Sequence, residues 1–122
     1  MKKEKEETNY TNVWMAFVDI SAGDSYIFTE LIDMEQKQID NYIGAWCYIV
    51  VIANNISDAL DIISKGLIEL HFQLNYVDSI RNVSTLIEDG EISEKDKREI
   101  DSLLTSKYIF KILDKLWPYV EK

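Results

Sequence analysis

The segment AWCYIVVIANNISDALDIISKGLIELHFQLNYV, from Ala45 to Val77, carries the clearest structural pattern of the chain. Its first part, Ala45 to Ala53, is short, apolar and rich in β-branched residues, which predicts a buried central strand. From Ile56 to Leu70 the apolar residues recur at helical spacing on one face, which predicts an amphipathic helix. Asn55 is a good N-cap residue, and Asp58 adds a carboxylate in the first turn, where the helix dipole favours it.

The helix is followed by a second predicted strand, His71 to Val77, in which apolar and polar residues alternate. Strand, helix and strand over residues 45–77 form a βαβ unit, for which we expect parallel strands and a right-handed crossover. Ser57 is an alternative N-cap residue, and it would move the start of the helix by two residues.

Upstream of this unit, Asn12 to Ser21 reads as a strand with two apolar faces, typical of a covered sheet. Residues 22–25 supply a turn, and Tyr26 to Ile32 is β-branched and aromatic, which predicts a second, antiparallel strand. We expect residues 33–44 to form a polar loop. A single helix from Asp24 to Tyr42 is the alternative.

Downstream, residues 78–93 fit either a short helix or an extension of the preceding strand. Ser93, with Asp96 three residues later, predicts the start of a helix that reaches residue 106. A last helix is predicted over residues 107–117, ended by Pro118.

These elements predict a single α+β domain over residues 11–122, preceded by a flexible charged tail over residues 1–10. We expect a mixed sheet of about four strands that contains the βαβ unit, with the C-terminal helices packed on it. The chain of 122 residues, 47% of them hydrophobic, is long enough to bury such a core without disulfides or zinc.

Composition also limits the cellular setting. A single cysteine cannot form an internal disulfide, which favours a reducing compartment. The N-terminus lacks the apolar stretch of a secretory signal, and the longest apolar run is too short to cross a bilayer. We therefore expect a cytoplasmic protein that does not enter membranes.

The formal net charge of −9 argues against direct binding to nucleic acid, which usually requires a basic patch. An acidic surface suits a basic protein partner instead. The four glycines form no nucleotide-binding motif, and no cofactor is expected.

Candidate catalytic residues are few. Cys47 lies within the apolar strand and is expected to be a core thiol. His71 is the only histidine, and no zinc pattern surrounds it. Glu30, Asp33 and Glu35 could hold Mg²⁺, but a solvated acidic loop is the preferred interpretation. We therefore expect neither an enzyme nor a metal site.

Residues 44–80 resemble a strand, capped helix and strand module of small bacterial α+β proteins. Ala53, Asn55, Asp58–Ala59, Leu67 and Phe72 carry the likeness. Several such proteins are immunity proteins that neutralise bacterial toxins, including those of contact-dependent growth inhibition. The resemblance implies an acidic inhibitor that binds a toxin domain.

The expected function is therefore that of an immunity-type inhibitor that binds a cognate toxin, a basic nuclease for example, through an acidic surface. A non-catalytic structural or regulatory subunit of a bacterial assembly is the alternative. The candidate partner-binding residues are carboxylates and one tyrosine in two polar segments: Glu30, Asp33, Glu35, Asp40, Tyr42, Glu88, Asp89 and Glu91.

Overall fold

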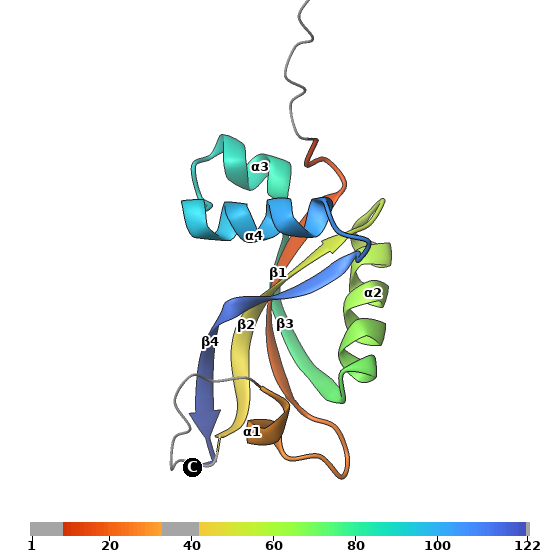
Figure 1. The fold of residues 1–122 in the computed structure, drawn as a ribbon, viewed down its shortest axis with the longest axis vertical. Helices are drawn as coiled ribbons and strands as arrows, with labels where there is room; N and C mark the ends of the chain where they lie inside the picture. The colour runs from red at the N-terminus through yellow and green to blue at the C-terminus, as the bar shows by residue number, and fades with distance from the viewer. Residues whose placement is uncertain (1–8, 33–41, 122) are drawn as a thin grey trace, which may run out of the picture.

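A computed structural model describes residues 9–32 and 42–121 of the chain. Helices and strands alternate irregularly along it (Figure 1). The elements are β1 (Val13–Ala22), α1 (Phe28–Leu31), β2 (Tyr42–Ile52), α2 (Ile56–Glu69), β3 (Phe72–Asn82), α3 (Val83–Glu88), α4 (Glu94–Leu104) and β4 (Phe110–Val120).

The four strands form one sheet in the order β3-β1-β2-β4, and every neighbouring pair is antiparallel. The single α+β domain is confirmed. The sheet is not mixed, however, because β1 lies between β2 and β3. These two strands both run antiparallel to β1 and so share a direction without pairing. The strand, helix and strand order over residues 45–77 is therefore correct, but the unit is split by β1.

The predicted N-caps of the two long helices are both present. The side chain of Asn55 accepts a hydrogen bond of 2.8 Å from the Asp58 amide, and α2 begins at the next residue. Asn55, rather than Ser57, is therefore the cap. The Ser93 hydroxyl accepts a bond of 3.1 Å from the Asp96 amide at the start of α4. Residues 78–93 contain both alternatives, since β3 extends to Asn82 and α3 follows.

The predicted strand at residues 26–32 is wrong, because this segment contains the short helix α1. The turn after β1 brings Phe28 into the core, where its side chain is 3% exposed and its ring lies 5.8 Å from that of Phe72. The antiparallel neighbours of β1 are β2 and β3 instead. Of the alternative helix over residues 24–42, residues 33–41 lie outside the described residues.

The predicted helix at residues 107–117 is also wrong, because β4 occupies this segment. Its apolar residues point to both faces of the sheet, because Ile112 and Leu116 pack with one hydrophobic cluster and Leu113 belongs to the other. Apolar residues at positions 109, 112, 113 and 116 therefore match helical spacing although the segment is a strand. Pro118 is tolerated because β4 is an edge strand.

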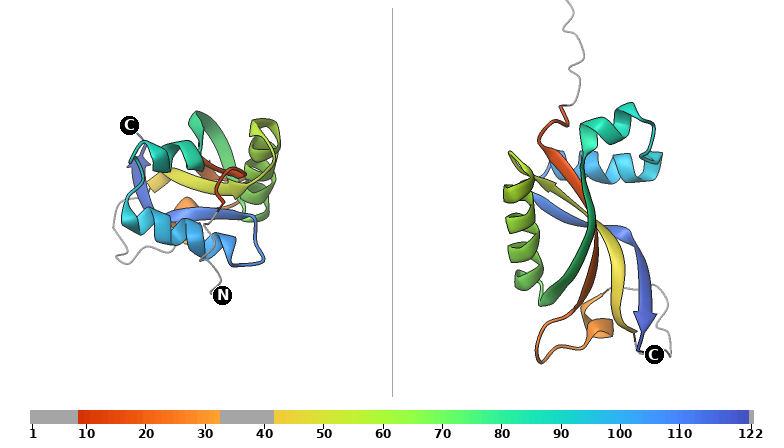
Figure 2. Two further views of the ribbon diagram at one scale, coloured as in Figure 1. Left: turned by 90° about the horizontal axis from the view of Figure 1, so that it is seen from above. Right: turned by 180° about the vertical axis from the view of Figure 1, so that it is seen from behind.

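Two hydrophobic clusters lie on opposite faces of the sheet. On one face, Ala16, Val18 and Ile20 of β1 pack with α1 and α2. On the other, Val13 and Met15 pack with α3 and α4. Figures 1 and 2 show α3 and α4 stacked across one end of the twisted sheet, while α2 runs beside β3. The second face is therefore covered by helices at one end.

The predicted tail at residues 1–10 lies mostly outside the described residues, which begin at residue 9. Within the described ranges, no helix has the length and hydropathy that a membrane span requires. The predicted core position of Cys47 is confirmed, because its side chain is fully buried.

Candidate functional site

The helix-free end of the second sheet face carries a group of large aromatic side chains. Alternation along β1 puts Phe17 and Asp19 on the same face as Met15. The partners of these two residues across β2 are Tyr48 and Trp46. We call this surface the aromatic face and define it by Phe17, Trp46, Tyr48, Tyr76 and Trp117.

The rings of the aromatic face pack against one another around Phe17. Its ring centroid lies 4.6 Å from Tyr48, 5.3 Å from Trp46 and 5.6 Å from Trp117. Trp46 also meets Tyr76 edge to face at 6.1 Å. Offset and edge contacts at these distances are favourable and fix the rings in place. The cluster is therefore a rigid surface.

Two of these rings are open to solvent. Trp117 is 41% exposed and Tyr76 is 60% exposed, and both belong to one packed group of rings. On this face, α3 and α4 pack against Met15. The hydrophobic cluster that they share with it includes neither Trp117 nor Tyr76. Exposed aromatic side chains held by a rigid scaffold are typical anchors of protein interfaces.

A carboxylate lies among the rings. The Tyr119 hydroxyl donates a hydrogen bond to the Asp19 carboxylate, although their strands are separated by β2. Gly44 makes this contact possible, because a Cβ there would lie 2.7 Å from Tyr119 Cζ and 2.6 Å from the Ile20 carbonyl oxygen. Burial, followed by the bond to Asp19, raises the pKa of Tyr119 to about 12. Tyr119 is therefore a neutral donor at physiological pH.

Polar side chains border the aromatic face beyond Asp19. The Asn75 amide nitrogen donates a 3.0 Å bond to the Ser21 hydroxyl, and Gln73 donates a 3.1 Å bond to the Asn75 amide oxygen. These groups are exposed and hydrogen-bonded to each other. The surface thus combines aromatic rings, one carboxylate and amide groups, a mixture typical of binding surfaces.

The structure does not bring the described members of the predicted partner-binding set together on one surface. Glu30 belongs to α1, and Tyr42 begins β2 and packs against the core. Glu88 and Asp89 lie at the end of α3, at the opposite end of the molecule (Figure 1). Outside the described residues lie Asp33, Glu35 and Asp40.

The carboxylates at the α3 end have a local cation. Arg81 makes a 2.7 Å ion pair with Glu91, and its other terminal nitrogen lies 3.9 Å from Asp89. All three side chains are about half exposed. Such pairs contribute little to stability, and the segment keeps its acidic character because Glu88 adds a further carboxylate.

The two residues considered for catalysis lie in different surroundings. Burial, reinforced by the charge of Asp19, raises the pKa of the Cys47 thiol to about 12, so the thiol stays protonated. His71 is exposed and adopts a positive φ of 72°, and its ring stacks on that of Tyr26 at 4.2 Å. Among residues 9–32 and 42–121, no three potential metal ligands of the His, Cys, Asp or Glu type come together.

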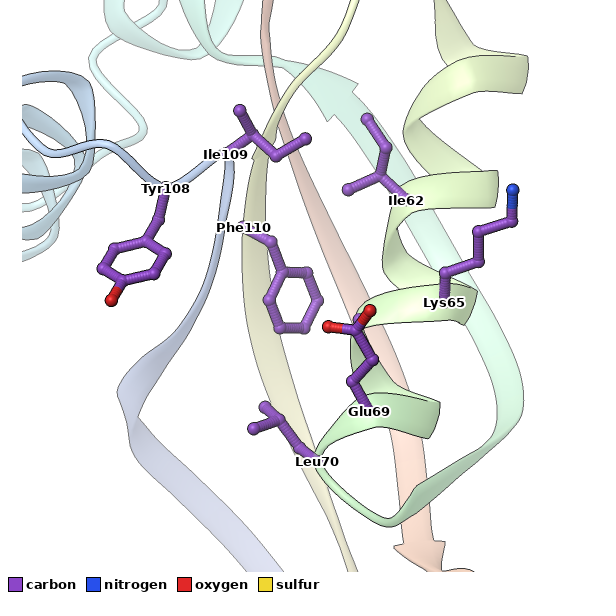
Figure 3. Close-up of a pocket in the computed structure, with 8 residues that line it drawn as sticks. Ile62, Lys65, Glu69, Leu70, Tyr108, Ile109 and Phe110 are labelled. Atoms are coloured by element: carbon purple, nitrogen blue, oxygen red, sulfur yellow. The ribbon is translucent and has the colours of Figure 1, made fainter.

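A second surface feature is a hollow of about 450 Å³ between α2 and the start of β4 (Figure 3). Leu70, Tyr108 and Ile109 line it and are about half exposed, while the ring of Phe110 packs against Gly66. The lining is mainly apolar. Lys65 at its edge is paired with Asp61 at 3.0 Å. The Glu69 carboxylate also lines the hollow. Its two rings, Tyr108 and Phe110, are not among the packed ring pairs of the described residues, in contrast to the rings of the aromatic face.

Comparison with models of known protein families, with curated proteins and with solved structures found no match. The resemblance of residues 44–80 to immunity proteins therefore stays a prediction. The function has to be inferred from the surfaces of the molecule, and the aromatic face is the strongest of these.

Proposed function

We propose that this protein is a non-catalytic, immunity-type inhibitor that binds and neutralises a cognate bacterial toxin domain, and that the aromatic face is its binding surface. The observation that carries the proposal is the exposure of Trp117 and Tyr76 within a packed ring cluster on a sheet. Aromatic residues of this kind dominate the binding energy of many protein interfaces.

The rigidity of the cluster supports a tight complex. Binding costs conformational entropy when side chains become ordered, and this cost is small for rings that already pack together. Phe17 contacts three other rings, and Trp46 contacts two. The aromatic face therefore needs little rearrangement when a partner covers it.

The charge of the chain supports a basic partner. The net charge of −9 produces a negative field that attracts cationic proteins and speeds their encounter. A nuclease toxin is basic because it must hold phosphate groups. In this proposal, Glu88, Asp89 and Glu91 act at long range, while the aromatic face makes the close contacts.

The test is a binding measurement with the protein encoded by the gene adjoining that of this chain. We expect the two proteins to co-purify and to form a complex measurable by calorimetry, and co-expression to protect cells from that protein's toxicity. Trp117→Ala should weaken the complex at least tenfold. Tyr108→Ala is the matched control, because Tyr108 is 62% exposed but lies beside α2.

Two results would contradict the proposal. The first is an adjoining gene product that neither binds the chain nor harms cells in its absence. The second is a complex that Tyr108→Ala weakens as much as Trp117→Ala does, since that would move the interface away from the aromatic face.

A further inference from the structure

Asp19 lies directly between two aromatic residues of the neighbouring strands. In the sheet register its partners are Trp46 on β2 and Tyr76 on β3. We infer that Asp19 and these rings receive one arginine side chain of the partner protein. This inference rests on the proposed function, because it names the group of the partner that the aromatic face recognises.

The two rings lean toward each other over β1. Strands two positions apart in a sheet are separated by about 10 Å. The ring centroids of Trp46 and Tyr76 are only 6.1 Å apart, with an interplanar angle of 78°. The two rings therefore contact each other edge to face next to Asp19, a residue that is partly buried.

The Asp19 carboxylate has acceptor capacity left. A carboxylate can accept about four hydrogen bonds, and the Tyr119 hydroxyl supplies one. Among the described residues, no lysine or arginine forms an ion pair with Asp19. A half-buried anion without a cation of its own attracts an external one more strongly than a fully solvated anion does.

The rings also suit a cation. The ammonium of Lys115 already lies 5.0 Å from the ring centroid of Trp117, so this face supports a cation–π contact within the chain. A guanidinium group is planar, stacks on aromatic rings and offers two parallel donors to a carboxylate. An arginine fits the combination of Trp46, Tyr76 and Asp19 better than a lysine does.

The chain contains an internal control for a direct test. It has three tryptophans, and the indole N–H of Trp14 donates a 3.0 Å bond to the Ala53 carbonyl while the ring packs with the cluster on the opposite face. Titration with N-acetyl-arginine amide should shift the indole NMR signals of Trp46 and Trp117 saturably and leave that of Trp14 unchanged. N-acetyl-citrulline amide, a neutral isostere, should shift none of the three.

Two variants then test whether Asp19 is the carboxylate that binds the arginine probe. Asp19→Asn removes the charge but keeps an oxygen for the Tyr119 hydroxyl, and Glu88→Gln removes one charge at the α3 end. Asp19→Asn should abolish the arginine-dependent shifts and weaken the partner about 10- to 100-fold, as expected for a charge-assisted hydrogen bond. Glu88→Gln should leave the arginine-dependent shifts unchanged.

Equal shifts with the arginine and citrulline probes would overturn the inference even if Asp19→Asn failed to fold. Unchanged arginine shifts in a folded Asp19→Asn variant would also overturn it. If the arginine probe fails while Trp117→Ala still weakens the partner, the cation site is wrong and the proposed function stands. If the arginine probe succeeds but no toxin is bound or neutralised, the proposed function fails and the cation site stands.

Discussion

Gly44 has no side chain, and this leaves the space through which Tyr119 reaches Asp19 on the aromatic face. Tyr119 crosses β2 above Gly44 to reach Asp19, and any side chain at residue 44 would occupy its path. The arrangement fixes the Asp19 carboxylate and removes the flexibility of the tyrosine. One glycine on β2 therefore holds three strands in a defined relation at this point.

Gly44→Ala should lower the free energy of unfolding by about 1–3 kcal/mol, because the new methyl group would be overpacked against Tyr119 and the Ile20 carbonyl. Urea-induced unfolding measures this loss. Gly90→Ala is the control: Gly90 has a φ of 69° and no atom near its missing Cβ, so only backbone strain is added. In Gly44→Ala alone, the pKa of Tyr119 should return toward its ordinary value. An unchanged titration of Tyr119 would refute this account.

Two neutral groups should make the protein sensitive to alkaline pH. Burial raises the pKa of Cys47 from 9.0 to about 12, and burial with the bond to Asp19 raises that of Tyr119 from 10.0 to about 12. Unfolding lets both groups ionise at their lower ordinary pKa values. Their contribution to stability is therefore complete below about pH 9 and is lost as the pH rises toward 12.

The double variant Cys47→Ala, Tyr119→Phe should show a flatter loss of stability than the wild type between about pH 9 and 11. Urea unfolding at several pH values gives this slope. The variant is expected to be less stable at neutral pH, since it loses a buried thiol and a hydrogen bond, so the slope and not the absolute value is compared. Identical slopes would show that these groups ionise equally in the folded and unfolded chain.

At the scale of the elements, the first turn of α2 is capped by one side chain, that of Asn55. Asn55→Ala removes the acceptor of the Asp58 amide and should lower the free energy of unfolding by about 1 kcal/mol. Asn54→Ala is a close control, because Asn54 is also exposed and precedes the cap. Its effect should stay within about 0.5 kcal/mol. Equal losses in chemical denaturation would mean that the capping bond is not formed in solution.

Local sequence patterns predicted the helices and strands that are bounded by turn or N-cap residues. The predicted strands β1 and β2 and the capped helices α2 and α4 are all confirmed. The helix predicted in place of β4 is wrong because apolar residues on both faces of this strand fall at helical spacing. The order of the strands in the sheet could not be predicted, because it depends on contacts between segments that are far apart in the sequence.

The aromatic face was only partly accessible to sequence reasoning. Trp117 was assigned to a helix, which placed it on no common surface with Phe17 and Trp46. One signal was present: Asp19 interrupts an otherwise apolar strand, and a charge there usually marks an open face. The neighbours of Asp19 became known only through the register of β1 with β2 and β3.

At the scale of the whole molecule, charge and shape have separate roles in the proposed complex. The net charge of −9 acts over roughly a Debye length, about 8–10 Å in ordinary buffers, whereas the rings act only in contact. The association rate should therefore fall steeply as salt increases, while the dissociation rate changes little. Stopped-flow fluorescence of the tryptophans can follow both rates.

Matched variants separate the two roles. Replacing Glu88, Asp89 and Glu91 by their amides should slow association, and Trp117→Ala should speed dissociation. Association that is independent of salt, together with an unaltered rate in the amide variant, would exclude long-range attraction by these carboxylates.

The strand order also has a consequence for the chain during its synthesis. β2 carries the most apolar run and needs β4 on one side, yet β4 is made only after α2, β3, α3 and α4. Until then, one edge of β2 offers unpaired backbone groups beside Ile49, Val50 and Val51. Such an edge is a template for aggregation between nascent chains. The yield of soluble protein should therefore depend on how quickly β4 closes the sheet, and chains ending before Phe110 should accumulate in inclusion bodies.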